Sequence, residues 1–97
     1  MNYVFHPEAE SEFFDAINYF EEQVEGMGNT FSREIFFTIR KITYFPFAWT
    51  LISRNARRIL VNRFPFGIIY QLNDDEILIV AVMHLSREPN YWKGRNK

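Results

Sequence analysis

The stretch that decides the fold of this 97-residue chain is ILIVAVMHLSREP, residues 77–89. Its first seven residues are all apolar, which is typical of a central strand covered on both faces. Residues 73–76 (NDDE) before it favour a tight turn, so we expect a hairpin with residues 68–72. A further strand is expected at residues 57–64, where Pro65-Phe66-Gly67 ends it. The second half of the chain therefore predicts an antiparallel meander of three strands.

The first half of the chain predicts a strand followed by a helical hairpin. Tyr3-Val4-Phe5 is a short apolar run, and Pro7 suits the first position of a helix. Apolar residues then recur every three or four positions, at Ala9, Phe13, Ile17, Phe20 and Val24. Gly26-Met27-Gly28 predicts a tight turn between the helices, which are therefore antiparallel. The second helix has Asn29 or Thr30 as its cap, and its buried stripe is Phe31, Ile35, Ile39 and Ile42.

Together these elements predict one α+β domain over residues 1–97, of order β-α-α-β-β-β. The helical hairpin is expected to pack on a mostly antiparallel four-stranded sheet. Residues 47–55 show no clean period and are expected to form a loop anchored by Trp49. The hairpin covers only one face of the sheet, and Tyr91 and Trp92 are candidates to cover the other. The expected core includes Phe13, Ile17, Phe20, Ile35, Ile39, Ile69, Ile79 and Ala81.

Composition excludes several classes of protein. The chain is 47% hydrophobic, which excludes disorder, and it has no cysteine, which excludes disulfide and zinc–thiolate frameworks. No apolar run approaches the roughly 20 residues of a membrane span, and residues 1–7 do not resemble a signal peptide. The two histidines lie far apart, and the sequence has no phosphate-binding loop. We therefore expect a soluble, cytoplasmic protein with no metal, no cofactor and no membrane partner.

The charges are unevenly distributed along the chain. Acidic residues dominate up to Glu34, whereas the stretch from Arg40 to Leu72 contains six bases and no acid. Arginine predominates there, and the guanidinium group matches phosphates and carboxylates. The basic stretch predicts attraction to phosphate or to an acidic partner; ordinary solvated charge is the alternative reading.

Two longer segments resemble a known family. These are RRILVNRFPFGIIY at residues 57–70 and AVMHLSREPNYW at residues 81–92, together with FHPEAE at residues 5–10. They are similar to the RelE/ParE superfamily of bacterial toxins from type II toxin–antitoxin (plasmid stabilisation) systems. The pattern His84-x-x-Arg87-x-Pro89 is the most specific part of the likeness. The resemblance implies a toxin that inhibits growth unless a cognate antitoxin binds it.

The superfamily implies two different activities. RelE-like members cleave messenger RNA in the ribosomal A site, and ParE-like members inhibit DNA gyrase without acting as nucleases. A nuclease here would use His84 for proton transfer, Arg63 and Arg87 for the phosphate, and Tyr91 for base stacking. Strand alternation is expected to place His84 on the same face as Val80 and Val82. A purely structural role for these side chains, with Arg87 paired to a nearby acid, is the alternative.

The missing lysines favour the ParE-like branch. RelE-type nucleases carry catalytic lysines before their second strand, but no lysine occurs here between Lys41 and Lys93. Arginine cannot replace lysine as a proton donor because its pKa stays above about 12. We therefore favour a toxin that acts by binding. A nuclease that uses His84 is the first alternative, and an inactive interaction module is another.

Two sets of residues are candidates for binding partners. The arginines proposed to bind the target or nucleic acid are Arg57, Arg58, Arg63 and Arg87. The antitoxin is expected to bind Phe36, Phe37 and Tyr44, which lie off the buried stripe, together with Arg57 and Arg58. Taken alone, the helix pattern favours an extension of the core for these aromatic residues, and an exposed patch for a partner is the other reading. The expected assembly is a homodimer or a toxin–antitoxin hetero-oligomer.

Overall fold

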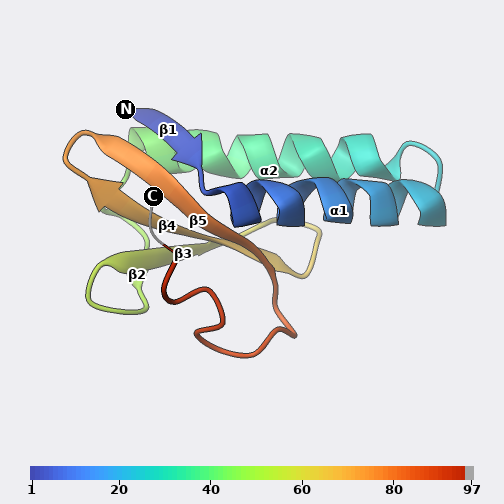
Figure 1. The fold of residues 1–97 in the computed structure, drawn as a ribbon. Coiled ribbons are helices and arrows are strands. Elements are labelled where there is room, and N and C mark those ends of the chain that lie inside the picture. Colours follow the sequence, from blue (N-terminus) through green and yellow to red (C-terminus); the bar gives the residue numbers. More distant parts are fainter. Residues whose placement is uncertain (96–97) are drawn as a thin grey trace.

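The computed structural model describes residues 1–95 as a helical hairpin packed on one face of a five-stranded sheet (Figure 1). The strand order in the sheet is β1-β5-β4-β3-β2. Strand β1 runs parallel to β5, and the other pairings are antiparallel. The elements are β1 (Asn2–Phe5), α1 (Pro7–Gln23), α2 (Met27–Tyr44), β2 (Thr50–Leu51), β3 (Ala56–Leu60), β4 (Phe66–Asn73) and β5 (Glu76–His84).

The predicted α+β class and the helical hairpin are confirmed, but the sheet has one strand more than expected. Thr50 and Leu51, in the segment expected to be a loop, form β2 by pairing with Arg58 and Arg57. No part of the sequence pattern marks so short a strand, because two residues cannot show a period. The expected interior place of residues 77–83 is confirmed, since β5 lies between β1 and β4.

Helix α1 begins where its sequence predicts. Pro7 is its first residue, and His6 caps it, because the His6 Nδ1 accepts a hydrogen bond from the Glu8 amide at 3.1 Å. Its expected stripe ends early, since the helix stops at Gln23 and Val24 is 53% exposed. Phe13 is buried, whereas Ile17 and Phe20 are only partly buried against the core.

Helix α2 begins at Met27, before the expected caps Asn29 and Thr30. The Glu21 carboxylate of α1 accepts the amides of Gly26 and Gly28 at 2.9 and 3.0 Å, so a neighbouring helix supplies the cap. Gly28 also permits close helix contact, because a Cβ atom there would lie 2.7 Å from the Ile17 carbonyl oxygen. The predicted stripe of α2 is buried as expected, at Phe31, Ile35, Ile39 and Ile42.

Strand β4 also begins earlier than expected. Phe66 and Gly67, expected in a turn, already pair with His84 and Met83 of β5. The chain reverses before them, because Arg63 adopts a left-handed φ of 74° and the Val61 amide bonds to the Phe66 carbonyl at 2.9 Å. The expected hairpin turn between β4 and β5 is confirmed, and Asp74 has a φ of 57° in it.

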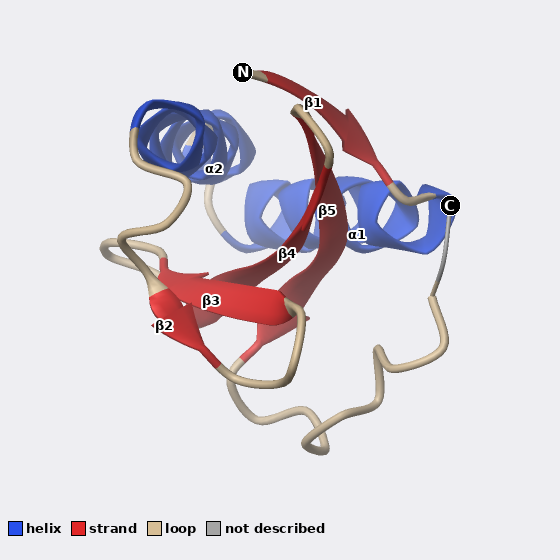
Figure 2. Cartoon of the chain, turned by 90° about the vertical axis from the view of Figure 1, so that its left-hand side faces the viewer, coloured by secondary structure: helices blue, strands red, loops and turns tan. Residues whose placement is uncertain are grey.

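The sheet has a buried cluster on each face. The helix-facing cluster includes Phe66, Ile68, Tyr70, Ile77 and Ile79 with the helix stripes. The opposite, outer cluster contains Ile69, Leu78, Val80, Ala81 and Met83, and Trp92 of the C-terminal segment packs against it. Figure 2 shows that segment running past the side of the sheet away from the helices. The expected cover by Trp92 is therefore confirmed, and it leaves Trp92 4% exposed.

Candidate functional site

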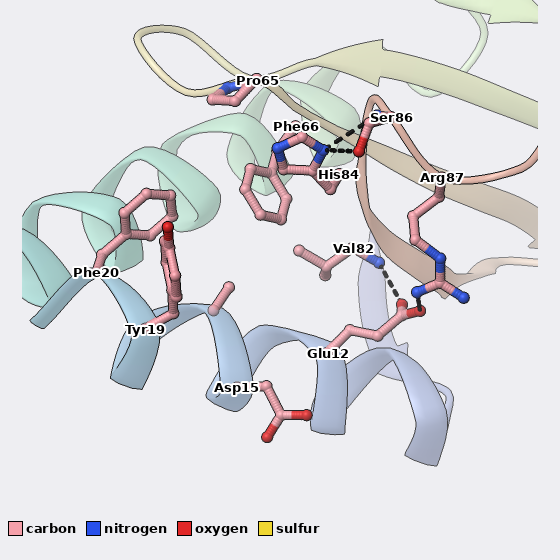
Figure 3. Close-up of a pocket in the computed structure, with 11 residues that line it drawn as sticks. Glu12, Asp15, Tyr19, Phe20, Pro65, Phe66, Val82, His84, Ser86 and Arg87 are labelled. Carbon is pink, nitrogen blue, oxygen red and sulfur yellow. Dashed lines mark hydrogen bonds and ion pairs between the residues drawn. The ribbon is translucent and has the colours of Figure 1, made fainter. Parts of the chain in front are cut away.

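A groove of about 650 Å³ lies between α1 and the C-terminal end of β5 (Figure 3). Its apolar walls come from both layers of the fold, and its polar residues lie on α1, at the last residue of β5 and just after it. The groove therefore brings His84 and Arg87, from the most specific part of the sequence pattern, next to the helical hairpin. The lining residues are Glu12, Asp15, Ala16, Tyr19, Phe20, Pro65, Phe66, Val82, His84, Ser86 and Arg87.

A β-bulge in β5 decides that His84 faces this groove. Ile69 pairs with Ala81 and Tyr70 pairs with Ile79, so Val80 is an extra residue without an opposite partner in β4. Val80 and Ala81 consequently both lie in the outer cluster, and Val82 returns to the helix-facing cluster. The expectation that His84 shares a face with both Val80 and Val82 is wrong for Val80. A bulge breaks strict alternation, and nothing in an all-apolar run reveals it.

The ring of His84 is fixed by its neighbours. Its Nδ1 accepts hydrogen bonds from the Ser86 amide at 3.0 Å and from the Ser86 hydroxyl at 2.7 Å. The ring also makes an edge contact with Phe66, with centroids 5.1 Å apart. Since the backbone amide can only donate, the neutral ring carries its proton on Nε2. Figure 3 shows the Nε2 edge turned toward the side of the groove where Phe20 and Tyr19 lie.

Glu12 is the central polar residue that sequence analysis missed. Its Oε1 accepts the Val82 amide at 3.0 Å, and Arg95 donates to both of its oxygens at 3.0 Å. The Tyr91 hydroxyl donates to Oε2 at 2.7 Å. The available signal was the spacing of Ala9, Glu12 and Phe13, which places an acid within the apolar stripe of α1.

Glu12 and Arg95 occupy the place of a missing strand. Strand β1 pairs with β5 only as far as Ile79, because Pro7 starts α1 two residues after β1 ends. Beyond that point the Val82 amide is bonded to Glu12, and the Val80 carbonyl accepts from Arg95 at 3.0 Å. Two side chains thus satisfy the backbone groups that β1 does not reach.

The environment of this cluster keeps Tyr91 neutral. Burial raises the pKa of the Tyr91 phenol, and its hydrogen bond to Glu12 and the charge of Glu12 raise it further. The Arg87 guanidinium also lies over the Tyr91 ring, 3.9 Å from the ring centroid. Tyr91 is therefore held by Glu12 and Arg87. Its hydroxyl is already bonded, and Arg87 covers one face of its ring, so that face cannot stack on a base.

The structure separates the predicted arginines. Arg57 donates to the carbonyls of Phe47 and Trp49 at 3.1 and 2.7 Å, so it holds the segment before β2. Arg58 lies on the outer face of the sheet, where it lines a small cavity with Arg87. Arg63 lies 3.6 Å from Glu34 of α2 and does not line the groove. Among the predicted nuclease residues, only His84 and Arg87 share the groove.

The predicted antitoxin-binding aromatics form an exposed face of α2. Phe36, Phe37 and Tyr44 are 47%, 56% and 70% exposed, so the reading that the helix pattern favours, an extension of the core, is wrong. Phe36 contacts the buried Phe13 with its ring edge, at a centroid distance of 5.4 Å. Arg33 and Arg40 line a shallow cavity with Phe36 and Phe37. The aromatic face of α2 (Phe36, Phe37 and Tyr44) is thus flanked by positive charge.

Metal-ligand clusters and membrane-spanning helices are both absent from the described residues. Over residues 1–95, no group of three histidine or acidic side chains is placed to hold a metal ion. Within the same part of the chain, neither helix has the length and hydrophobicity needed to cross a membrane.

Comparisons with known proteins agree with this architecture. One solved structure, titled "Chromosomal ParDE TA system from P. aeruginosa", aligns with a TM-score of 0.62 and 11% sequence identity. The alignment covers 87% of this chain and 95% of that chain, and it shows a shared fold. No curated protein matches the chain. Residues 3–89 match the family described as "ParE toxin of type II toxin-antitoxin system, parDE". The RelE/ParE resemblance is therefore confirmed, and this chain belongs to the ParE toxin family of type II toxin–antitoxin systems.

Proposed function

We propose that this toxin inhibits growth by binding a target protein and not by cutting RNA, with DNA gyrase as the candidate target. The observation that carries the proposal is the separation of the residues a nuclease would need. Arg63 lies at Glu34, and the Tyr91 hydroxyl is bonded to Glu12. The Nδ1 of His84 is occupied by Ser86, and no lysine occurs between Lys41 and Lys93 to transfer protons.

A type II toxin has an antitoxin as its partner, and we propose that the aromatic face of α2 receives part of it. Exposed aromatic rings supply most of the affinity of protein interfaces, and flanking charges speed and orient the encounter. Arg40 serves this second role on α2 itself. Arg58 lies on the outer face of the sheet, so the same antitoxin reaches it only if its segment wraps around the domain. Arg57 has a structural role in this proposal.

The test combines growth with two biochemical assays. The toxin and its His84→Gln variant are each induced without antitoxin in a bacterial host. Purified protein is then assayed for inhibition of gyrase supercoiling and for cleavage of ribosome-bound messenger. We expect both proteins to stop growth and inhibit supercoiling, and neither to cut messenger. Cleavage in the A site that His84→Gln reduces by orders of magnitude would contradict the proposal. Normal growth despite confirmed expression would favour an inactive interaction module.

A further inference from the structure

The groove beside β5 has an apolar floor and one positively charged end. Ala16, Phe66 and Val82 are buried beneath it, and Phe20 is partly buried at its side. Tyr19 forms a wall that is 57% exposed. His84 and Arg87 stand at the end of the groove that follows β5, and the Arg87 amide bonds to the His84 carbonyl at 3.0 Å. That turn holds the two residues next to each other.

Within residues 1–95, Arg87 has one ion-pair partner, Glu12, and other groups already satisfy that carboxylate. Glu12 already accepts four close hydrogen bonds, from Val82, Tyr91 and both Nη atoms of Arg95. Arg87 reaches Glu12 only at 3.9 Å, beyond hydrogen-bond distance, and its side chain is 51% exposed. Its donors are therefore open to another acceptor.

His84 offers a second donor at the same end of the groove. Its Nδ1 accepts from Ser86, so the proton is on Nε2, which faces the groove and has no hydrogen-bond acceptor among residues 1–95. A guanidinium matches the two oxygens of a carboxylate, and the imidazole N–H, which points toward Tyr19 and Phe20, can donate to a separate oxygen. Asp15 lines the α1 side, so an incoming carboxylate is repelled from there and directed toward Arg87, whereas Arg95 balances the charge of Glu12.

We propose that this groove binds a segment of the antitoxin that presents a carboxylate beside a large apolar side chain. The carboxylate accepts from Arg87, the Nε2–H of His84 donates to a backbone carbonyl of the segment, and the apolar side chain packs between Tyr19 and Phe66. Only the assignment to the antitoxin rests on the proposed function; the chemistry of the groove does not. The groove is a second anchoring site, distinct from the aromatic face of α2. Two modest contacts joined by one segment bind more tightly than either alone.

The first experiment measures the chemistry of the groove with a small probe. N-acetylphenylalanine, which has a phenyl ring beside a carboxylate, is titrated into labelled toxin and followed by NMR. N-acetylphenylalanine amide, which lacks the charge, is the matched ligand. We expect shifts at Ala16, Val82 and His84, with the acid binding roughly 5- to 10-fold more tightly than the amide. Equal binding of acid and amide, or shifts confined to another surface, would overturn the proposal.

Three variants separate the parts of the site. Arg87→Gln is expected to remove the preference for the acid, and Tyr19→Ala to weaken acid and amide alike. Arg54→Gln is the matched control, because it removes an exposed arginine from the turn between β2 and β3. Thermal unfolding checks that each variant is folded. Retention of the acid preference by folded Arg87→Gln would contradict the assigned role of Arg87.

The second experiment tests the assignment to the antitoxin. We expect Arg87→Gln to speed dissociation of the antitoxin about 5-fold or more, and Arg54→Gln to leave it unchanged. Unchanged dissociation from a folded Arg87→Gln variant would overturn the assignment. Probe binding by a toxin that does not inhibit growth would refute the proposed function while supporting the chemistry of the groove.

Discussion

Glu12 lies on α1, yet its carboxylate is bonded to the backbone of β5 and to two side chains of the C-terminal segment. Its side chain is 16% exposed and that of Arg95 is 10% exposed, so both charges are largely removed from water. A charge in such a place is stabilised only while its partners remain. The pair is therefore the residue-level contact on which the docking of the C-terminal segment depends.

Removal of either member of this pair is expected to destabilise the fold. Glu12→Ala leaves the Val82 amide and the Arg95 guanidinium without their acceptor, at a cost of about 2–4 kcal/mol in the free energy of unfolding. Glu12→Gln retains an acceptor for Val82 and should lose less. Chemical denaturation of Glu12→Ala, Arg95→Ala and the double variant forms a thermodynamic cycle. Additive losses in this cycle would show that the pair is not coupled.

Tyr70 makes the stability of the fold decrease at alkaline pH. Its ring is fully buried and its hydroxyl donates to the Pro46 carbonyl at 2.7 Å. Burial raises the pKa of Tyr70 to about 12, although the charge of Arg57 acts to lower it. The unfolded phenol titrates near about 10, so between these values the unfolded state loses a proton that the folded state keeps. Stability conferred by this residue is therefore complete below about pH 10 and falls as the pH rises toward 12.

Tyr70→Phe is expected to flatten that alkaline decline. Each such tyrosine contributes at most about 1.4 kcal/mol per pH unit within the window. Tyr91, whose pKa is also raised, should maintain part of the slope. The measurement is urea denaturation at several values between pH 9 and 11.5. Tyr44→Phe, at a tyrosine that is 70% exposed, is the control and should leave the slope unchanged. An unaltered slope in Tyr70→Phe would refute the assignment.

At the scale of elements, the hairpin of α1 and α2 depends on the absence of a side chain at Gly28. A Cβ atom at that position would lie 2.7 Å from the Ile17 carbonyl oxygen, closer than such atoms approach in proteins. The obstacle is backbone, which cannot rotate away as a side chain can. The two helices must separate for any other residue to fit.

Gly28→Ala is therefore expected to lower the free energy of unfolding by about 1–3 kcal/mol. Helix propensity acts in the opposite direction, because alanine is favoured over glycine within a helix. Asn29→Ala changes an exposed neighbour in the same turn and controls for that effect. Thermal or urea unfolding of both variants gives the comparison. A gain in stability for Gly28→Ala would show that the helices adjust without cost.

The sequence predicts the long, periodic elements and misses the short or irregular ones. The stripe of α2 and the run in β5 each repeat over many residues, so their patterns are clear. Strand β2 is too short for a pattern, and the start of α2 depends on Glu21 from another helix. For the site, the motif around His84 and Arg87 was found from the resemblance. Glu12 was missed, because its role depends on the missing partner strand beyond Ile79.

At the scale of the whole molecule, the helical layer presents its apolar rings outward on α2, and the groove lies on the α1 side at the end of β5. Exposed aromatic groups of this kind mark interaction surfaces and not core. A partner that binds both regions must cross the helical hairpin or pass around its end. An extended segment meets that requirement more readily than a compact domain.

The aromatic face of α2 can be tested by truncation. We expect Phe36→Ala, Phe37→Ala to weaken antitoxin binding at least 10-fold, mainly through faster dissociation. The loss of stability should stay near about 1 kcal/mol, because only Phe36 contacts a buried ring. Val24→Ala, at an apolar residue that is 53% exposed in the hairpin turn, is the control. Unchanged antitoxin affinity in the stable double variant would contradict this interface.

The extra residue in β5 has a consequence for how such a toxin diverges. A side chain at the end of a strand changes face when one residue is gained or lost before it, since the period of a strand is two, unless a bulge takes up the change. Loss of the single codon for Val80 would remove the bulge and restore regular pairing, and His84 would still pair with Phe66 and face the groove. One in-frame deletion is thus absorbed by the strand at this point, whereas a second deletion would carry the histidine to the outer face.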